Sequence, residues 1–413
     1  MNKKRIVITG IGVVSPIGIG KEAFWQGLKE GKSCVKPITL FKTDNLKVNV
    51  GGEISDFDPS ALIGRKVQPN VDRAAMLLIA SAKEAIGDAG LIINDNTTGQ
   101  IGMVSGTTLG TIYNISEFDK ESLSEGPRFA NPSTFTGTVA NAPSSKVAIH
   151  FKIKGFNTTI STGMCAALDS IEYGCNFLDF GRANTVLAGF AEDLNQQTFL
   201  GYYQLGYLSG LGNGAVPVSR PYDKNRDGII VSEGAGMLVM ETKEHASENN
   251  RKIYAEVLGV GSSFDPTKQY KYNPGGEGMS RAMGNALRNA EIKKKEIDCI
   301  FSNANSTQDA DRIESQAIRR VFGETVDGIS VTAIKSMIGE TFSASGGMAV
   351  IAAIGALVSQ EIAPTVNYVE KDSSCDLNYV INKPQKKNMD KIMVNAFGPN
   401  GANTSVIIGR YHE

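Results

Sequence analysis

The sequence predicts an α/β protein built from two similar halves. Strand-like and helix-like segments alternate along the chain, which is typical of sheets covered by helices. The length of 413 residues exceeds what one ordinary hydrophobic core supports, so we expect two packed halves. We place them at residues 1–250 and 251–413. The segment KIYAEVLGVGSSFDP, which begins at residue 252, repeats the alternation and the glycine-then-proline ending of RIVITGIGVVSPIG. Chance likeness between two α/β segments explains this repeat equally well.

Apolar, β-branched runs mark the strands of the first half, and helical spacing marks its helices. Residues 71–90 carry apolar side chains at helical spacing and end at Gly90, which favours a helix with a glycine C-cap. After a turn at Gly163, CAALDSIEYGCNFLDFG predicts a helix of about 16 residues. The expected strands are RIVITGIGVV (5–14), GQIGMVSGT (99–107), FNTTIST (156–162) and ANTVLAGFAED (183–193).

The second half continues the same alternation. GGMAVIAAIGALVSQ is apolar on all sides, so we expect a helix buried within two sheets that have helices between and around them. The other expected segments are the helices GMSRAMGNALRNAEI and RIESQAIRRVFG, the strands DCIFSNAN and ISVTAIKSMIG, and the final strands of KIMVNAFGPNGANTSVIIGR.

Composition argues against several classes of protein. The net charge of −1 gives no reason to expect binding to nucleic acid or to a membrane surface. The five cysteines are scattered without a C-x-x-C pair, which argues against disulfides or zinc and for a cytoplasmic protein. The basic, apolar start resembles a signal peptide superficially, but Gly10 and Gly12 interrupt it, so we predict a buried first strand. Every apolar run falls short of the ~20 residues that span a bilayer.

Two weak motifs predict neither a cofactor nor a metal. GIGVVSPIGIG lacks the spacing of a dinucleotide-binding glycine motif. Asp223, Asp227 and Glu233 lack the spacing of an EF-hand loop, so we interpret that segment as a loop held by local hydrogen bonds.

The segment STGMCAALD (161–169) is the candidate site for chemistry. It predicts a strand end, a tight turn and a helix start, which is an arrangement that often presents a reactive side chain. This evidence alone leaves three alternatives open: the reactive group is Met164, it is Cys165, or the segment carries no reactive group.

Four further segments carry a resemblance to a known family. They are SRPYDKNRDGIIVSEGAGMLVMETKEHA (219–246), IKSMIGE (334–340), NAFGPNGAN (395–403) and VLAGFAED (186–193). Together they resemble β-ketoacyl-ACP synthases of the type II elongating kind, and the likeness runs essentially from end to end. It implies a thiolase-like fold, in which two similar halves form a layered α-β-α-β-α core. Active members condense an acyl chain with a malonyl unit on acyl carrier protein, using a cysteine, two histidines and a supporting lysine.

The resemblance places substitutions at the reactive positions of this chain. Met164 falls on the nucleophile, and a thioether forms no thioester. Asn305 and Glu340 fall on the two histidines, whereas Lys335 is retained. The acidic residues Asp311 and Glu314 are also kept.

The remaining residues offer little to replace the lost groups. The chain has three histidines, His150, His245 and His412, so a pair of convergent catalytic histidines is hard to assemble. Cys165 lies one residue beyond the turn, so on a helix it points about 100° away from Met164. We expect a small buried cysteine there. An insertion or deletion that moves Cys165 into the nucleophile position remains the alternative.

Loss of the catalytic groups makes the chain resemble one class within this family. Chain length factors are ketosynthase β subunits of type II polyketide synthases, which pair with an active ketosynthase α subunit as a heterodimer and set the length of the chain carried on acyl carrier protein. The segment 104–127 resembles their tunnel-lining helix, and ordinary amphipathic packing is the alternative. The resemblance places Ile112, Tyr113, Ile115, Ser116 and Asp119 along or at the end of the tunnel.

The gate loop also departs from the active family. Its run is Gly398-Pro399-Asn400, so Pro399 replaces the gating phenylalanine and favours a fixed loop. Two other functions stay open. One is an acyltransferase with altered chemistry at Cys165, or at Glu340 with Lys335. The other is a degraded homodimeric fatty-acid synthase subunit that has no partner.

Overall fold

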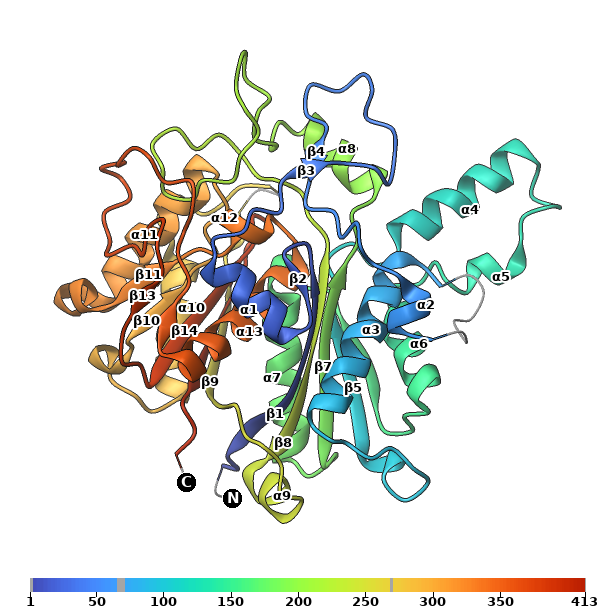
Figure 1. Cartoon of the computed structure of the whole chain (residues 1–413), viewed down its shortest axis with the longest axis horizontal. Helices are drawn as coiled ribbons and strands as arrows, with labels where there is room; N and C mark the ends of the chain where they lie inside the picture. The colour runs from blue at the N-terminus through green and yellow to red at the C-terminus, as the bar shows by residue number, and fades with distance from the viewer. Residues whose placement is uncertain (1–2, 65–70, 268–269, 413) are drawn as a thin grey trace.

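The computed structural model describes residues 3–64, 71–267 and 270–412, and an 11-stranded mixed sheet organises them (Figure 1). In their order across the sheet, the strands are β11 (Ser330–Thr332), β10 (Cys299–Phe301), β14 (Lys391–Phe397), β15 (Ala402–Gly409), β9 (Ala255–Phe264), β1 (Ile6–Ser15), β8 (Gly234–Thr242), β7 (Thr185–Glu192), β5 (Ile101–Gly106) and β6 (Asn157–Ile160), with β2 (Gly18–Ile19) paired to β1.

The two halves of the chain form the two ends of this sheet. We expected two separate sheets, but β1 and β9 join them through three antiparallel pairs, Ile6–Val257, Val7–Glu256 and Ile8–Ala255. Beyond a bulge between Ile8 and Gly10, β1 remains paired with β8, and β9 remains paired with β15. A bulge increases the local twist of a strand, so the half-sheets separate from this point.

Helices form three layers around the half-sheets, which is the predicted thiolase-like α-β-α-β-α arrangement (Figure 1). The middle layer holds α7 (Ala166–Asp179) and α13 (Ser343–Ser359), which contact each other and strands of the sheet. The predicted buried helix is α13, and its residues 343–357 are all buried. The outer layers hold α3 (Arg73–Asp88) and α6 (Ala142–Phe151) on the first half, and α10 (Glu277–Asn289) and α11 (Gln308–Phe322) on the second.

Shorter elements complete the described chain. They are α1 (Lys21–Lys29), α2 (Pro59–Leu62), α4 (Ile112–Ser124), α5 (Pro132–Phe135), α8 (Gln196–Gln204), α9 (Lys243–Glu248), α12 (Lys335–Ile338), the paired strands β3 (Lys36–Pro37) and β4 (Val50–Gly51), and the paired strands β12 (Glu361–Ile362) and β13 (Gln385–Lys386). Among the residues described, no helix is long and apolar enough to cross a membrane.

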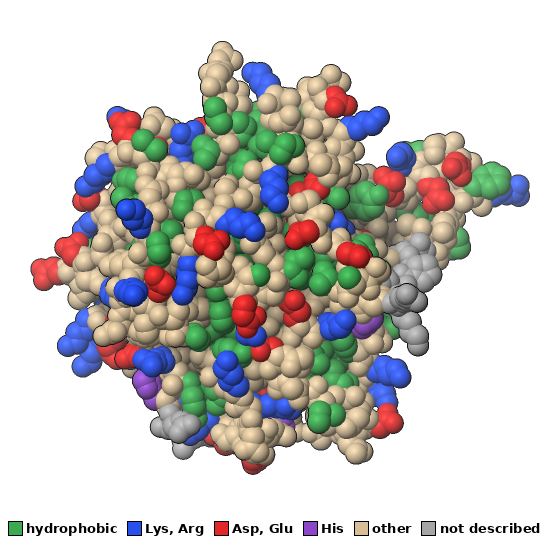
Figure 2. Space-filling model, viewed as in Figure 1, with side chains coloured by type: hydrophobic (Ala, Val, Ile, Leu, Met, Phe, Trp, Pro, Cys, Tyr) green, Lys and Arg blue, Asp and Glu red, His purple; other side chains and the backbone are tan. Residues whose placement is uncertain are grey.

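An arm formed by α4 and α5 projects from the body of the molecule (Figures 1 and 2). None of the residues of α4 is buried. Large apolar side chains are nevertheless exposed along the arm, including Leu123 (86%), Phe129 (69%) and Phe135 (58%).

Carboxylates from α3 replace the missing strand partner where β1 leaves β9. The backbone N–H of Ile11 donates to Asp88 Oδ2 at 2.9 Å, and that of Val13 donates to Glu84 Oε2 at 3.2 Å. Lys21 and Tyr254 also bond to Asp88, whereas Glu84 has no cation within ion-pair distance among the described residues. Burial is the main cause that raises the pKa of Glu84, to about 7.

We predict that Glu84 makes the stability of the fold decrease as pH rises between about 4.5 and about 7. The folded chain keeps the proton on Glu84 up to about pH 7, whereas the unfolded chain releases it near 4.5. Glu84→Gln retains an acceptor for Val13 but no longer titrates. Urea unfolding across this pH range should show a shallower slope for Glu84→Gln than for the unsubstituted chain. An unchanged slope would contradict the assignment, and the exposed control Glu125→Gln should leave the slope as it is.

Candidate functional site

The predicted turn between β6 and α7 is present and has a backbone that suits glycine. Gly163 has φ +67°, in the left-handed region, and begins a short 3₁₀ turn, Gly163–Cys165, that leads into α7. A Cβ atom at Gly163 would lie 2.8 Å from Nδ2 of Asn400. The loop between β14 and β15 is therefore packed directly against this turn.

Met164, which the resemblance places at the nucleophile position, is an apolar packing residue. Its exposed fraction is 6%. Its buried apolar neighbours form a cluster of Ile38, Val48, Leu194, Phe199, Leu208, Ile229, Val231 and Phe342. A thioether in such surroundings has no proton to give up and no thiolate to form.

Cys165 is buried on the other side of the turn, as its helical position predicts. Its side chain is fully buried, and its Sγ donates a hydrogen bond to the carbonyl oxygen of Ala396 at 3.0 Å. Burial, with a smaller effect of the Asp169 charge, raises the pKa of the Cys165 thiol well above its ordinary value. Because the thiolate is the nucleophilic form, this placement disfavours acyl transfer by Cys165.

The other predicted positions meet in one buried network. Lys335 Nζ lies 2.9 Å from Glu340 Oε2, and Asn305 Nδ2 donates to the same oxygen at 3.2 Å. The second oxygen, Oε1, accepts from the N–H of Phe342 at 3.0 Å and from Ser345 Oγ at 2.8 Å. Exposed fractions of 4% for Lys335, 1% for Glu340 and 4% for Asn305 place this ion pair away from water. Each oxygen of Glu340 therefore has two partners, as a buried charge requires.

Asn303 connects this network to the end of β14 and was not predicted from the sequence. Lys335 Nζ donates to Asn303 Oδ1 at 3.1 Å, and Asn303 Nδ2 donates to the carbonyl oxygen of Phe397 at 3.0 Å. The sequence signal that could have identified Asn303 is its position two residues before Asn305, in the loop that follows β10. Ser345 was also missed, because nothing in its local sequence distinguishes it from the other small residues of α13.

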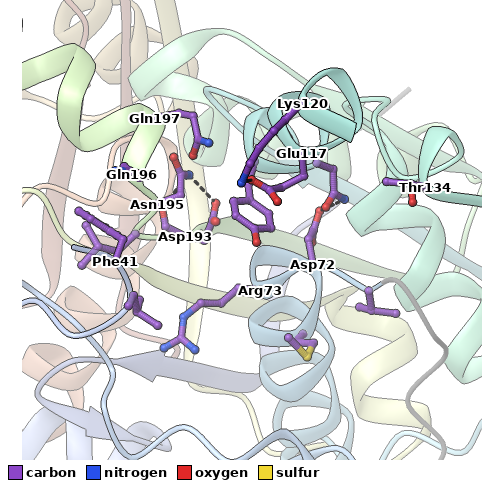
Figure 3. A pocket seen from close by; sticks show the side chains of 16 residues that line it. Phe41, Asp72, Arg73, Glu117, Lys120, Thr134, Asp193, Asn195, Gln196 and Gln197 are labelled. Carbon is purple, nitrogen blue, oxygen red and sulfur yellow. Dashed lines mark hydrogen bonds and ion pairs between the residues drawn. The ribbon is translucent and has the colours of Figure 1, made fainter. Parts of the chain in front are cut away.

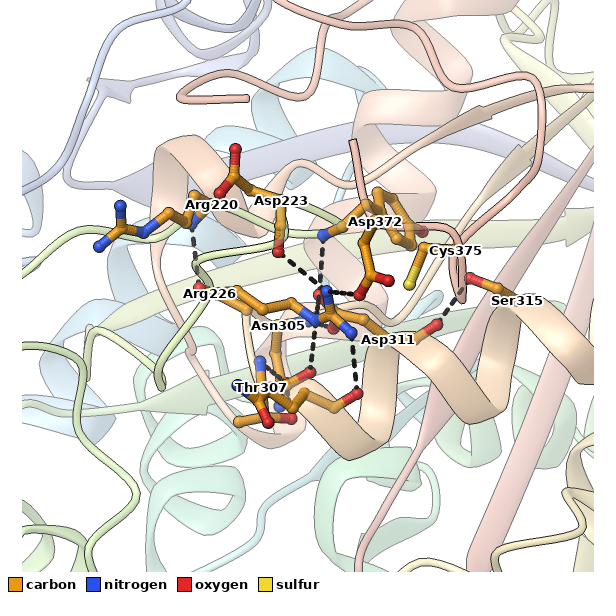
Figure 4. Close-up of polar contacts among 12 residues, drawn as sticks. Arg220, Asp223, Arg226, Asn305, Thr307, Asp311, Ser315, Asp372 and Cys375 are labelled. Atoms are coloured by element: carbon orange, nitrogen blue, oxygen red, sulfur yellow. Dashed lines mark hydrogen bonds and ion pairs between the residues drawn. The ribbon is translucent and has the colours of Figure 1, made fainter. Parts of the chain in front are cut away.

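The retained acids on α11 hold the loop that carries Asn305 (Figure 4). Asp311 Oδ1 accepts from the N–H of Asn305 at 2.9 Å, and Arg226 lies 3.6 Å from Asp311 Oδ2. Glu314 Oε1 accepts from the N–H of Asn303 at 3.0 Å. Burial is the main cause that raises the pKa of Asp311 to about 6 and that of Glu314 to about 7. Both acids thus position the backbone of the loop.

The gate loop forms a tight connection between β14 and β15. Gly398 and Pro399 are buried and Asn400 is exposed. The N–H of Gly398 donates to the carbonyl oxygen of Ala402 at 2.9 Å, and the N–H of Gly401 donates to that of Gly398 at 3.1 Å. These bonds and the fixed φ of proline favour one conformation of the loop.

The five predicted tunnel residues all lie on α4, and most of them face outward in the single chain. Tyr113, Ile115 and Asp119 are exposed, whereas Ile112 and Ser116 are half-buried. Ser116 Oγ accepts from Gln197 Nε2 on α8 at 2.8 Å, which ties the arm to the body. Their role in a tunnel stays a prediction.

A hollow of about 640 Å³ lies between α4, the start of α3 and the start of α8 (Figure 3). Tyr113 lines it, whereas the other four predicted tunnel residues do not. Asp72 and Asp193 lie on its wall, and burial together with the charge of Asp72 raises the pKa of Asp193 to about 7. The neighbouring Arg73 bonds to Glu233 at 2.6 Å.

The three histidines lie outside the buried network. His150 packs against Phe151 in the last turn of α6, with ring centroids 4.7 Å apart. His245 Nδ1 lies 2.7 Å from Glu241 Oε1, and His412 lies 3.4 Å from Asp390. In the described part of the chain, no three His, Cys, Asp or Glu side chains are grouped as metal ligands would be.

Comparisons with known proteins agree with this architecture. Residues 3–246 match the β-ketoacyl synthase N-terminal domain family, and residues 254–369 match the β-ketoacyl synthase C-terminal domain family. The 3-oxoacyl-[acyl-carrier-protein] synthase 2 of Coxiella burnetii is 34% identical over 414 residues, and that of Synechocystis is 31% identical over 412 residues. The first alignment covers 100% of both chains, and the second covers 100% of this chain and 99% of the relative.

Solved structures show the same fold. A chain of the ishigamide ketosynthase/chain length factor superposes with a TM-score of 0.93 at 32% identity, covering 99% of this chain and 100% of that one. A β-ketoacyl synthase from Burkholderia phymatum superposes with a TM-score of 0.90 at 27% identity over the same shares of the two chains. The protein therefore belongs to the β-ketoacyl synthase family and has its thiolase-like ketosynthase fold.

Proposed function

We propose that this chain is a chain length factor, the non-catalytic subunit of a type II polyketide synthase. In this role it pairs with an active ketosynthase α subunit, and the pair elongates a chain carried on acyl carrier protein. The observation that carries the proposal is the composition of the centre, where Met164 stands beside the closed network of Lys335, Glu340 and Asn305. The similarity to a ketosynthase/chain length factor structure supports it.

The contacts of the network oppose catalysis by this centre. Condensation needs a nucleophile and free donors that stabilise the oxyanion formed during the reaction. Here Lys335 and Asn305 each donate to Glu340 Oε2, an oxygen of a negatively charged carboxylate. A developing oxyanion beside this carboxylate would be repelled by it. The residues therefore stabilise one another and offer no site for the reaction.

The arm supplies the surface that such a role requires. Its exposed apolar side chains, among them Tyr113 (44%) and Ile115 (42%), are suited to burial against a second subunit. A solved structure of a type II polyketide synthase acyl-carrier protein in complex with its ketosynthase superposes on this chain with a TM-score of 0.91 at 26% identity. We therefore assign an active ketosynthase and an acyl carrier protein as the partners.

The proposed function predicts that acyl groups bind to the partner and not to this chain. Intact-mass spectrometry after incubation with acyl-ACP, alone and with an active ketosynthase from the same genome, should show an adduct on the ketosynthase only. Cys165→Ser should leave this result unchanged, because its thiol is buried. An adduct on this chain that disappears in Cys165→Ser would support an altered acyltransferase in place of the proposal.

The proposed function also predicts a heterodimer that depends on the arm. Native mass spectrometry of the co-expressed proteins should show one copy of each subunit. Ile115→Asp places a charge on the exposed face of α4 and should raise the Kd of the pair about tenfold or more. The matched control Ile92→Asp alters another exposed isoleucine (66%), outside the arm, and should not change the Kd. A stable homodimer that does not bind the ketosynthase would contradict the proposal and favour a fatty-acid synthase subunit.

A structural role for the ion pair predicts non-additive effects on stability. Lys335→Met leaves Glu340 as an unpaired buried charge and should lower the free energy of unfolding by about 3–5 kcal/mol. Adding Glu340→Gln removes that charge and should restore at least part of the loss in urea unfolding. The condensation rate per folded complex with the ketosynthase should be the same for the double variant as for the unsubstituted chain. Loss of that rate in the refolded double variant would instead assign Lys335 and Glu340 an acid–base role.

A further inference from the structure

A second hollow lies next to the buried network, on the side of Asn305 where Thr307 is located. It has a volume of about 430 Å³, and its lining includes Tyr207, Tyr272 and Thr307. Thr307 Oγ1 donates to Asn305 Oδ1 at 2.8 Å, and Asn305 in turn bonds to Glu340. The wall of the hollow at Thr307 is thus separated from Glu340 by the single side chain of Asn305.

Three aromatic rings in contact with one another connect this hollow to the apolar cluster that contains Met164. Tyr207 lines the hollow, and its ring centroid lies 6.2 Å from that of Tyr202 at an angle of 84°. Tyr202 stacks on Phe342, with centroids 4.8 Å apart and an angle of 26°. Phe342 belongs to the apolar cluster that contains Met164. We call Tyr207, Tyr202 and Phe342 the aromatic column.

Polar contacts fix both ends of the aromatic column. At the outer end, Tyr207 Oη donates to the carbonyl oxygen of Tyr270 at 2.7 Å. At the inner end, the N–H of Phe342 donates to Glu340 Oε1 at 3.0 Å, so the position of this ring depends on the buried ion pair. Phe342 also has φ +47°, an uncommon value for a bulky residue, which the surrounding packing must maintain.

The residues beyond the column are closed to solvent. Phe342 is fully buried, Glu340 is 1% exposed and Met164 is 6% exposed. On the side of the hollow that leads towards Met164, a flexible arm therefore meets the ring of Tyr207 first. Moving Tyr202 aside would break its stacking on Phe342 and open a cavity in the cluster, both of which cost free energy.

We infer that the aromatic column bars the thiol-terminated pantetheine arm of a carrier protein from this chain's own centre. Tyr202 and Tyr207 are then specificity-determining residues, because they leave the partner's centre as the acceptor. The identity of the carrier rests on the proposed function, whereas the closure is a property of this chain alone.

The test introduces a reporter thiol by Met164→Cys in the full chain. The probe is pantetheine carrying a haloacetamide in place of its thiol, and peptide mass spectrometry measures its attachment at position 164. Iodoacetamide rates in the same variants correct for differences in thiol reactivity, and the chain without Met164→Cys gives the background from native cysteines. We expect the probe to modify the reporter far more slowly than it does in urea.

Truncation of the column should open the route. Adding Tyr202→Ala or Tyr207→Ala should increase the corrected probe rate about tenfold or more, since rings no longer fill the path. Tyr202→Phe keeps the ring and should stay slow, as should Tyr113→Ala, which removes a ring on α4 instead. Thermal unfolding identifies any variant that does not fold. If Tyr207→Ala does not fold, Tyr207→Leu is tested in its place.

Two results would overturn the inference. One is rapid modification of the reporter with the aromatic column intact. The other is slow modification in folded Tyr202→Ala and Tyr207→Ala alike, which would assign the closure to other residues. Neither depends on whether a heterodimer forms, so failure of the proposed function leaves this test unaffected.

Discussion

The buried pair of Lys335 and Glu340 determines the form of the centre. Two charges removed from water are tolerated only when each finds close partners. The pair therefore organises its surroundings, since Asn303, Asn305, Ser345 and the N–H of Phe342 all bond to it. These residues come from the loop before α11 and from the start of α13. One interaction thus joins the loop before α11 to the start of α13.

The separation of the two half-sheets explains why these segments can meet. Because β1 and β9 share only three residue pairs, the half-sheets leave room for α7 and α13 between them. Glu84 and Asp88 bond to the N–H groups of β1 that the separation leaves without a strand partner. The turn with Met164 lies at the start of α7 and contacts α13. The site is therefore a consequence of the layered fold and not of local sequence alone.

Much of this arrangement could be predicted from the sequence, and the failures have physical reasons. The apolar character of its sequence on all sides identified α13 as buried, and the angle between successive helical residues predicted that Cys165 points away from Met164. The joining of the sheets was missed because three residue pairs leave no periodic signal. Ordinary-looking tyrosines, Tyr202 and Tyr207, were also missed, because stacking on the distant Phe342 is a tertiary contact. The proposed role of α4 needs a second subunit, which one sequence does not supply.

Loss of the nucleophile and closure of the centre are linked by packing. A centre that receives an acyl chain must keep an unfilled route, and unfilled apolar space destabilises a core. Once Met164 removes the need for that route, rings such as Tyr202 and Phe342 add stability by filling it. On the arm, by contrast, Leu123 and Phe129 are 86% and 69% exposed. In the proposed role, the molecule has closed the surface that a substrate would use and kept open the surface that a partner would use.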